Sequence, residues 1–409
     1  MVPARPALAR PADPRTSRPG RGLAALGLAG LLGATGCVAN EPDGAAALSV
    51  DSSATACTVS SPEAPSGTIT FSVTNTGSEV TEFYLLADDR LRVVSEVENI
   101  GPGLTRDLVV QVPAGTYWTA CKPGMVGEGI QSEFTVTDSG EAVGATGAVA
   151  EQLAEAEASY VAYVKDQVSS LVAGTQAFAD AYASGDDDTA RSLYAATRVH
   201  WERVEPVAES FGDLDPLLDA READLADGEE WSGWHYVEKD LWPPAAEANG
   251  GVEYHALTSD ERTAAAADLV AYTDRLSEAV TDESFTFAAF QISNGAKELL
   301  DEVATGKITG EEEIWSHTDL WDVAANVDGA SVALGVLREV ATARDPELVA
   351  ELDARFEALG ALLAQHGSYE EGFTPYDELS TAEVTDLAAA VDAVGEPLSR
   401  LTATITSAA

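Results

Sequence analysis

The hydrophobic pattern of the chain changes once, near residue 140, and this change constrains the fold more than any other feature. Between about Cys57 and Asp138, apolar residues alternate with Thr and Ser, as at Ile69, Phe71 and Val73. Alternation with a period of two is typical of half-buried strands, and Gly, Pro and Asp separate the runs. Several short strands within roughly 80 residues predict a small β-sandwich.

After a joint rich in Gly and Ala at 139–147, the pattern becomes helical and remains so to the end. Apolar residues recur at helical spacing, as at Leu153, Ala156 and Tyr160. Breaks rich in Gly and Pro leave helices long enough for a bundle of roughly 260 residues. We therefore expect an all-β domain at 55–138 and an all-α domain at 148–409.

The first 36 residues are typical of a signal peptide. Five Arg residues precede an apolar run from Leu23 to Leu32, which is too short to span a bilayer permanently. Small residues at 34–36 precede Cys37, as in a bacterial lipobox, so we expect Cys37 to be lipidated and 37–54 to be a tether. Ordinary secretion with an incidental Cys37 is the alternative. Either reading places the mature protein outside the cytoplasm.

The charge balance excludes nucleic acid as a partner. The chain has 69 Asp and Glu against 23 Lys and Arg, for a formal net charge of −46. No basic surplus is present to displace phosphate counterions. The hydrophobic fraction of 45% is ordinary for a globular chain that builds a sizeable core.

Besides Cys37, the chain has two cysteines, Cys57 and Cys121, and both fall in the β region. In an oxidising compartment an even pair favours one disulfide over a redox or metal role. A type-1 copper site needs two His and one Cys, and the first His of the chain is His200, so such a site is excluded by inventory. A carboxylate site that uses Glu82, Glu96 and Glu98 stays open.

The helical region contains the residues most suited to metal binding. His235 and Glu238 are three residues apart, so both can face the interior of a bundle, where carboxylates from other helices complete metal sites. Glu202 and Glu205 have the same spacing and are expected to share a helix face, while Pro206 frees the carbonyl of Glu202. A solvated acidic face is the alternative for these two.

Residues 198–242 resemble the imelysin-like (peptidase M75) family, and 80–84, 96–103 and 120–125 resemble the cupredoxin-like domain of its longer, iron-uptake members. The resemblance covers about 55–400. It implies an all-β cupredoxin-like sandwich followed by an all-α imelysin-type domain of two four-helix bundles. It also implies capture of iron, as Fe³⁺ or Fe²⁺, and its delivery to a membrane permease, with a haem peroxidase as the third component.

Carried over by position, the family's metal ligands have counterparts here, and the helix at 298–302 would supply one further acidic ligand, Asp301 in preference to Glu302. Oxygen-rich ligation with one imidazole also suits Zn²⁺. The expected ligands are Glu202, Glu205, Asp219, His235, Glu238 and Asp301.

The peptidase label of the family is not supported by the residues. A zinc peptidase motif of the His-x-x-Glu-His kind fails because position 239 is Lys, and no Gly-x-Ser-x-Gly elbow is present. We therefore expect no enzymatic activity. A metal-dependent hydrolase, a binding protein for another divalent metal and one for a cation-bridged polysaccharide remain the alternatives.

Overall fold

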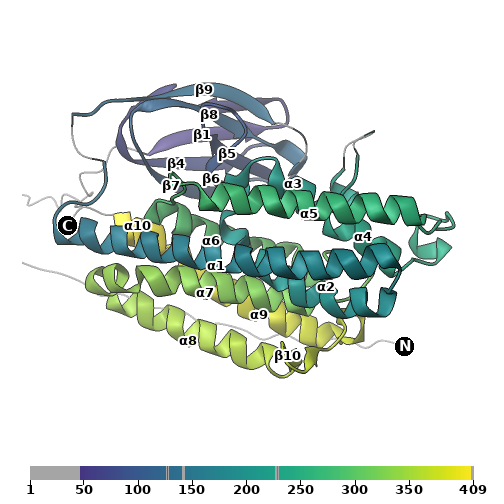
Figure 1. The fold of residues 1–409 in the computed structure, drawn as a ribbon. Helices are drawn as coiled ribbons and strands as arrows, with labels where there is room; N and C mark the ends of the chain where they lie inside the picture. The colour runs from purple at the N-terminus through teal and green to yellow at the C-terminus, as the bar shows by residue number, and fades with distance from the viewer. Residues whose placement is uncertain are drawn as a thin grey trace, which may run out of the picture. The chain divides into compact units, whose positions relative to one another are not determined.

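The computed structural model describes residues 47–406 except 126, 128, 141–142, 226–227 and 229. The predicted signal peptide at 1–36 and Cys37, the predicted lipidation site, lie outside this range. A β domain comes first, and a helical domain follows it (Figure 1). The strands of the β domain are β1 (Leu48–Ser53), β2 (Ala56–Val59), β3 (Glu63–Pro65), β4 (Gly67–Asn75), β5 (Thr81–Leu86), β6 (Val93–Ile100), β7 (Thr105–Val112), β8 (Gly115–Cys121) and β9 (Ile130–Thr137).

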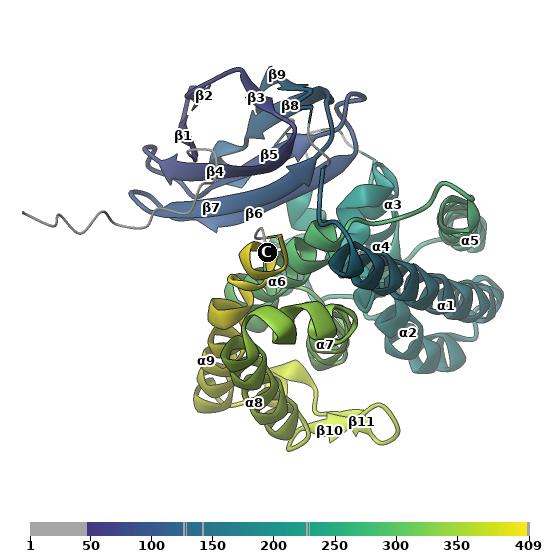
Figure 2. The same cartoon turned by 90° about the vertical axis from the view of Figure 1, so that its left-hand side faces the viewer.

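The β domain consists of two sheets, with strand orders β2-β1-β4-β7 and β3-β9-β8-β5-β6 (Figure 2). The predicted alternation is confirmed in β4, where Ile69, Phe71 and Val73 are buried and the residues between them are half-exposed. Phe71 meets Phe83 of the other sheet with ring centroids 5.2 Å apart. The apolar faces of the two sheets therefore share one core, as in a β-sandwich.

The β domain begins earlier than the sequence predicted. β1 lies within 37–54, the segment expected to be a tether, and pairs in parallel with β4 from Leu48 to Ser52. Val50 is buried in the sandwich core, and Ser52 donates to or accepts from Thr81 over 2.7 Å. The strand was not predicted because the residues of this segment are small and polar. Its pairing with β4 stabilises it.

Cys57 and Cys121 form a disulfide with Cα atoms 5.5 Å apart and a sequence separation of 64. We expect the Cys57→Ser/Cys121→Ser variant to lose about 2–4 kcal/mol of unfolding free energy, because the bond restricts the unfolded chain. Urea denaturation under non-reducing conditions measures this loss, and reduction of the parent protein should reproduce it. Equal stability of parent and variant would contradict the prediction.

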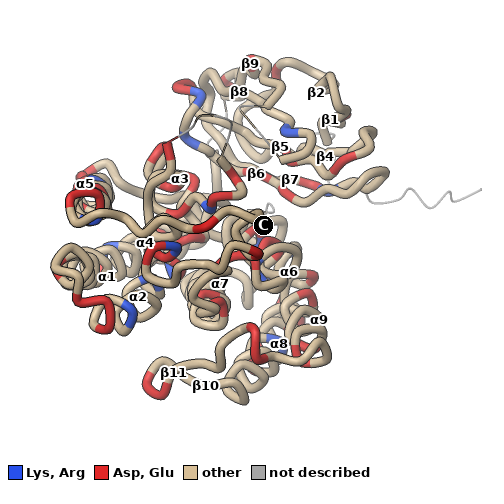
Figure 3. Tube along the Cα trace, turned by 90° about the vertical axis from the view of Figure 1, so that its right-hand side faces the viewer, with Lys and Arg blue, Asp and Glu red and all other residues tan. Residues whose placement is uncertain are grey.

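The helical domain starts at Ala148, where the pattern switches to helical spacing. Acidic residues outnumber basic ones in both domains (Figure 3). Long helices form most of the domain, and short helices lie between them and at the end of the described chain. The helices are α1 (Ala148–Ser184), α2 (Asp187–Glu202), α3 (Leu214–Asp219), α4 (Trp234–Leu241), α5 (Ser259–Thr281), α6 (Ala289–Thr305), α7 (Asp319–Arg344), α8 (Pro346–Leu363), α9 (Thr381–Leu398) and α10 (Leu401–Thr406).

Within the described residues, α7 alone is long and apolar enough to cross a membrane by length and composition. Of its most apolar window, 67% is buried inside the protein. Val323, Ala330 and Leu337 are fully buried in the main helical core. These contacts identify α7 as the central helix of the domain.

Helix α6 joins the two domains. Phe290 belongs to the hydrophobic core of the β domain, and Asn294 donates hydrogen bonds of 2.8 Å to Ser95 Oγ and to the Val109 carbonyl. Asp301, further along α6, forms an ion pair with Arg106 of β7. α6 therefore contacts the sandwich along much of its length.

Candidate metal centre

The centre is built around His235 on α4. The helix follows Gly233, whose φ is +91° and where an added Cβ would lie 2.3 Å from the Leu218 carbonyl oxygen, so only glycine fits this close approach. His235 and Glu238 are both buried. Their spacing on α4 confirms the prediction that they lie on one helix and share a face.

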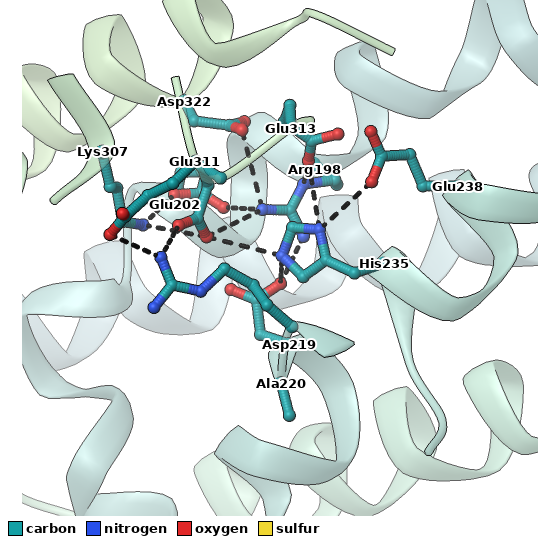
Figure 4. A network of polar contacts seen from close by, with 12 residues as sticks. Arg198, Glu202, Asp219, Ala220, His235, Glu238, Lys307, Glu311, Glu313 and Asp322 are labelled. Carbon is teal, nitrogen blue, oxygen red and sulfur yellow. Dashed lines mark hydrogen bonds and ion pairs between the residues drawn. The ribbon is translucent and has the colours of Figure 1, made fainter. Parts of the chain in front are cut away.

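Four carboxylates surround the imidazole of His235 (Figure 4). Nε2 lies 3.5 Å from Asp219 Oδ1 and 3.4 Å from Glu312 Oε1. Nδ1 lies 3.6 Å from Glu238 Oε2 and 3.8 Å from Glu313 Oε1. These distances exceed those of hydrogen bonds, and neither nitrogen has a hydrogen-bond partner among the described residues. Two groups of metal-binding geometry result, Asp219–His235–Glu312 and His235–Glu238–Glu313.

The separation of the donor atoms suits a metal ion. Ligand atoms about 2.1 Å from a tetrahedral ion lie about 3.4 Å from each other. The Nε2 distances to Asp219 and Glu312 match this value. A nearby carboxylate on the other nitrogen of a ligating His fixes the tautomer and orientation of its ring, and Glu238 is placed to do so.

Glu238 is itself held in place from the other side. Its Oε1 accepts hydrogen bonds from the backbone N–H groups of Trp315 and Ser316 at 2.9 and 2.7 Å. Oε2 is thereby directed toward His235 Nδ1 and has no hydrogen-bond partner among the described residues. The surrounding carboxylates raise the pKa of His235 well above its usual value, against the opposing effects of burial and of Arg198.

Glu202, Glu205, Asp219, Glu238, Glu312 and Glu313 are together called the acidic cluster. Arg198 of α2 is a fully buried cation within it. Its guanidinium contacts Asp219, Glu202 at 2.5 Å and Glu313 at 2.7 Å. Burial opposes its charge, but the neighbouring carboxylates outweigh this effect and raise its pKa. Although burial acts in the other direction, Arg198 holds the pKa of Asp219 below its usual value. Asp219 is therefore an anion that a metal can share with Arg198.

Glu202 and Glu205 lie in the cluster but not on one helix. Glu202 is the last residue of α2, and Glu205 begins the 3-10 helix η2 (Glu205–Phe211), which corrects the predicted shared helix face. The reason is Pro206, which cannot donate to the Glu202 carbonyl. Asn326 of α7 donates to that carbonyl instead at 3.0 Å. Both carboxylates contact the ammonium of Lys307, at 3.0 and 2.6 Å.

Asp301, the sixth expected ligand, is not brought to this cluster. Its carboxylate contacts Arg106 and, at 2.8 Å, Lys297. Glu302, the neighbour to which it was preferred, instead lines the cavity next to the cluster. One residue along α6 turns a side chain by about 100°, and sequence alone could not decide between the two.

Glu312 and Glu313 were missed by the sequence analysis. They follow the 3-10 helix η5 (Lys307–Thr309), in the segment that leads into α7. Both are buried, and each lies beside one nitrogen of His235. The available signal was the run Glu311-Glu312-Glu313, but such a run is ordinarily a solvated surface.

A cavity of about 720 Å³ lies between the β domain and the helices, next to Asp219 and Glu312. Its lining is strongly acidic and comes from both domains. A second cavity of about 380 Å³ contacts His235 and Glu238 and is lined by Trp231 and Trp315. The acidic residues of the larger cavity are Glu82, Glu96, Glu98, Glu205, Glu209, Asp215, Asp219, Asp224, Glu298, Glu302, Glu311 and Glu312.

We expect the buried carboxyl groups to give the metal-free protein an unusual pH dependence. Burial raises the pKa of Glu302 to about 7 and that of Asp319 to about 6. A carboxyl group whose pKa is higher in the folded than in the unfolded protein stabilises the folded state at pH values below its unfolded pKa. This stabilisation is lost as the pH rises through the folded pKa. We expect the unfolding free energy to fall by about 2 kcal/mol between pH 5 and pH 8.

Urea denaturation of chelator-treated protein at several pH values measures this trend. Saturating Zn²⁺ should weaken it, since a bound cation favours the ionised carboxylates. Below about pH 4 the trend should reverse, because the pKa values of Asp219 and Glu312 are lowered in the folded protein. Stability that rises steadily from pH 5 to pH 8 without metal would show that these groups are not buried as described.

The helical domain matches the family model of imelysin (peptidase M75) over residues 156–401, so the chain belongs to the imelysin family. It is 34% identical over 338 residues to the iron uptake system component EfeO of Escherichia coli (strain K12), covering 82% of this chain and 85% of that one. It is 35% identical over 343 residues to the iron uptake system component EfeO of Yersinia pestis, with the same coverage. The similarity to these relatives extends beyond the helical domain.

Proposed function

We propose that this protein is an extracytoplasmic component of an iron-uptake system that binds iron and passes it to a membrane permease. The observation that carries the proposal is the Asp219–His235–Glu312 group beside a large acidic cavity. We infer that the metal is iron because relatives at 34–35% identity are named as iron uptake system components. Carboxylate oxygens with one imidazole suit Fe²⁺, Fe³⁺ or Zn²⁺ and disfavour Cu(I).

In this proposal His235 Nε2, Asp219 and Glu312 bind the iron. Glu238 and Glu313 lie against Nδ1 and fix the orientation of the ring. Glu202 and Glu205, both expected ligands, add negative charge to the cluster and are held by Lys307. Asp301 takes no part, because its carboxylate is engaged by Arg106 and Lys297.

The acidic cavity serves as the approach to the centre. Carboxylates of one sign in a low-dielectric cleft raise the local concentration of cations. We further propose that the β domain is cupredoxin-like, that the helices form two four-helix bundles, and that a lipid at Cys37 anchors the chain to the membrane surface. The permease and a haem peroxidase would then be its partners.

Iron uptake by cells tests the proposal directly. Cells that carry the permease but lack this chain should take up less ⁵⁵Fe than the parent, and the full-length chain should restore uptake. A Cys37→Ser variant should restore it only in part if anchoring matters for delivery. Uptake that does not depend on the chain would refute the proposal.

Metal binding should release protons, because His235 must lose its proton and the surrounding carboxylates hold it at neutral pH. We expect the affinity for Zn²⁺ or Fe²⁺ to fall at least about tenfold between pH 7.5 and pH 5.5. Calorimetric titrations in two buffers of different ionisation enthalpy measure the protons released. An affinity that does not change with pH would contradict this prediction.

A further inference from the structure

Lys307 is a buried cation whose role the proposed iron site does not explain. Its side chain is 1% exposed and lies inside the acidic cluster, on the side away from His235 Nδ1 (Figure 4). The ammonium is 3.0 Å from Glu202 Oε2, 2.6 Å from Glu205 Oε1 and 3.6 Å from Glu312 Oε1. Three carboxylates from two segments of the chain, 202–205 and 312, therefore converge on one nitrogen, in the manner of ligands around an ion.

The surroundings of this ammonium contain further oxygen atoms. Asn326 donates through Nδ2 to Glu202 and Glu205, while its Oδ1 has no hydrogen-bond partner among the described residues. Asp322, which packs against the same cluster through Arg198 Nη2 at 3.7 Å, is 1% exposed, and neither of its oxygens has a hydrogen-bond partner in the described part of the chain. Buried oxygens without donors are costly unless a cation satisfies them. This half of the cluster thus has more oxygen ligands than Lys307 uses.

The backbone of Lys307 is fixed at both ends. The N–H of Gly306 donates to the Glu302 carbonyl at 2.7 Å, and that of Gly310 donates to the Lys307 carbonyl at 3.0 Å. An added Cβ at Gly310 would lie 2.6 Å from the ring of Tyr376, so the turn packs closely there. The position of the ammonium is therefore set by the fold and does not depend on a mobile loop.

One oxygen connects this half of the cluster to the proposed iron site. Glu312 Oε1 is 3.4 Å from His235 Nε2 and 3.6 Å from Lys307 Nζ. In two-metal sites a shared carboxylate commonly lies between ions about 3.5–4 Å apart. The ammonium thus shares a carboxylate oxygen with the proposed iron site, as the second ion of such a pair would.

We propose that Lys307 is an internal counter-cation that fills a second metal subsite, formed by Glu202, Glu205 and Glu312, and so limits the centre to one metal ion. Because the ammonium is covalently part of the chain, it neutralises these carboxylates without a second metal ion having to bind there. The consequence is a centre that takes up and gives up a single ion. The inference rests on the proposed function for the iron site at His235. The subsite that Lys307 fills does not depend on that proposal.

Zn²⁺ titration of the Lys307→Met variant tests the inference. The parent should bind about one equivalent of Zn²⁺ per chain, and the variant about two, because the freed carboxylates match the ligand preferences of a divalent ion. Calorimetry and metal analysis of dialysed protein give the stoichiometry. Lys297→Met is the matched control, since Lys297 is 13% exposed and is likewise paired with two carboxylates, Glu298 and Asp301, and it should keep the stoichiometry of the parent.

Two further variants keep the result decisive. If Lys307→Met does not fold without metal, Zn²⁺ should restore its folding, and the neutral Lys307→Gln variant should fold and also gain about one equivalent. In His235→Ala/Lys307→Met only the second subsite remains, so about one equivalent should bind even if the proposed iron site is wrong. Folded variants that bind no more Zn²⁺ than the parent, or an unfolded variant that Zn²⁺ does not rescue, would overturn the inference.

Discussion

Replacement of His235 by Ala is expected to weaken metal binding at least about 100-fold while the protein stays folded. His235 contributes the one nitrogen donor of the centre, and both metal-binding groups share its ring. Loss of the imidazole leaves carboxylates that Arg198 and Lys307 already engage. Competition with a chelator of known affinity, with Fe²⁺ under anaerobic conditions and with Zn²⁺, measures the effect.

The matched control is His317→Ala. The side chain of His317 is 41% exposed, and its one ion-pair distance, to Asp377, is 3.9 Å. Its removal should leave the affinity within about twofold of the parent, since an exposed, weakly paired group contributes little. If both variants bind equally well, iron does not bind at His235, and the carboxylates Glu82, Glu96 and Glu98 of the β domain become the better candidates.

Local patterns in the sequence predicted most of the fold. The alternation at Ile69, Phe71 and Val73 and the helical spacing from Leu153 onward depend on nearest neighbours along the chain, so they are visible without the structure. The β1 strand at 48–53 was missed because its residues are small and polar and show no clear alternation, although it pairs antiparallel with the adjacent β2 and in parallel with β4. Parallel pairing leaves no turn signal between the partners.

The same distinction applies to the site. His235 and Glu238 are three residues apart on α4, so their shared face follows from helix geometry. Glu312 lies 77 residues after His235 along the printed sequence, and nothing local relates the two. The cations were missed for a related reason: Arg198 and Lys307 are ordinary basic residues until folding buries them among carboxylates.

Arg198 shows how strongly the centre depends on these buried cations. Its guanidinium is fully buried and contacts Glu202 of α2, Asp219 of α3 and Glu313 in the segment before α7. The neutral Arg198→Met variant would leave these carboxylates buried without their partner. Removal of one member of a buried ion-pair network typically costs about 3–5 kcal/mol, so we expect a loss of that size in unfolding free energy.

Urea denaturation of metal-free protein at neutral pH measures this loss. Arg338→Met is the matched control, because Arg338 pairs with Asp353 at 2.7 Å on the surface and its loss should cost less than about 1 kcal/mol. Saturating Zn²⁺ should recover more stability in Arg198→Met than in the parent, since the freed carboxylates then favour a cation. A variant as stable as the control would mean that the cluster does not need the guanidinium, and that several of its carboxyl groups are protonated in the folded protein.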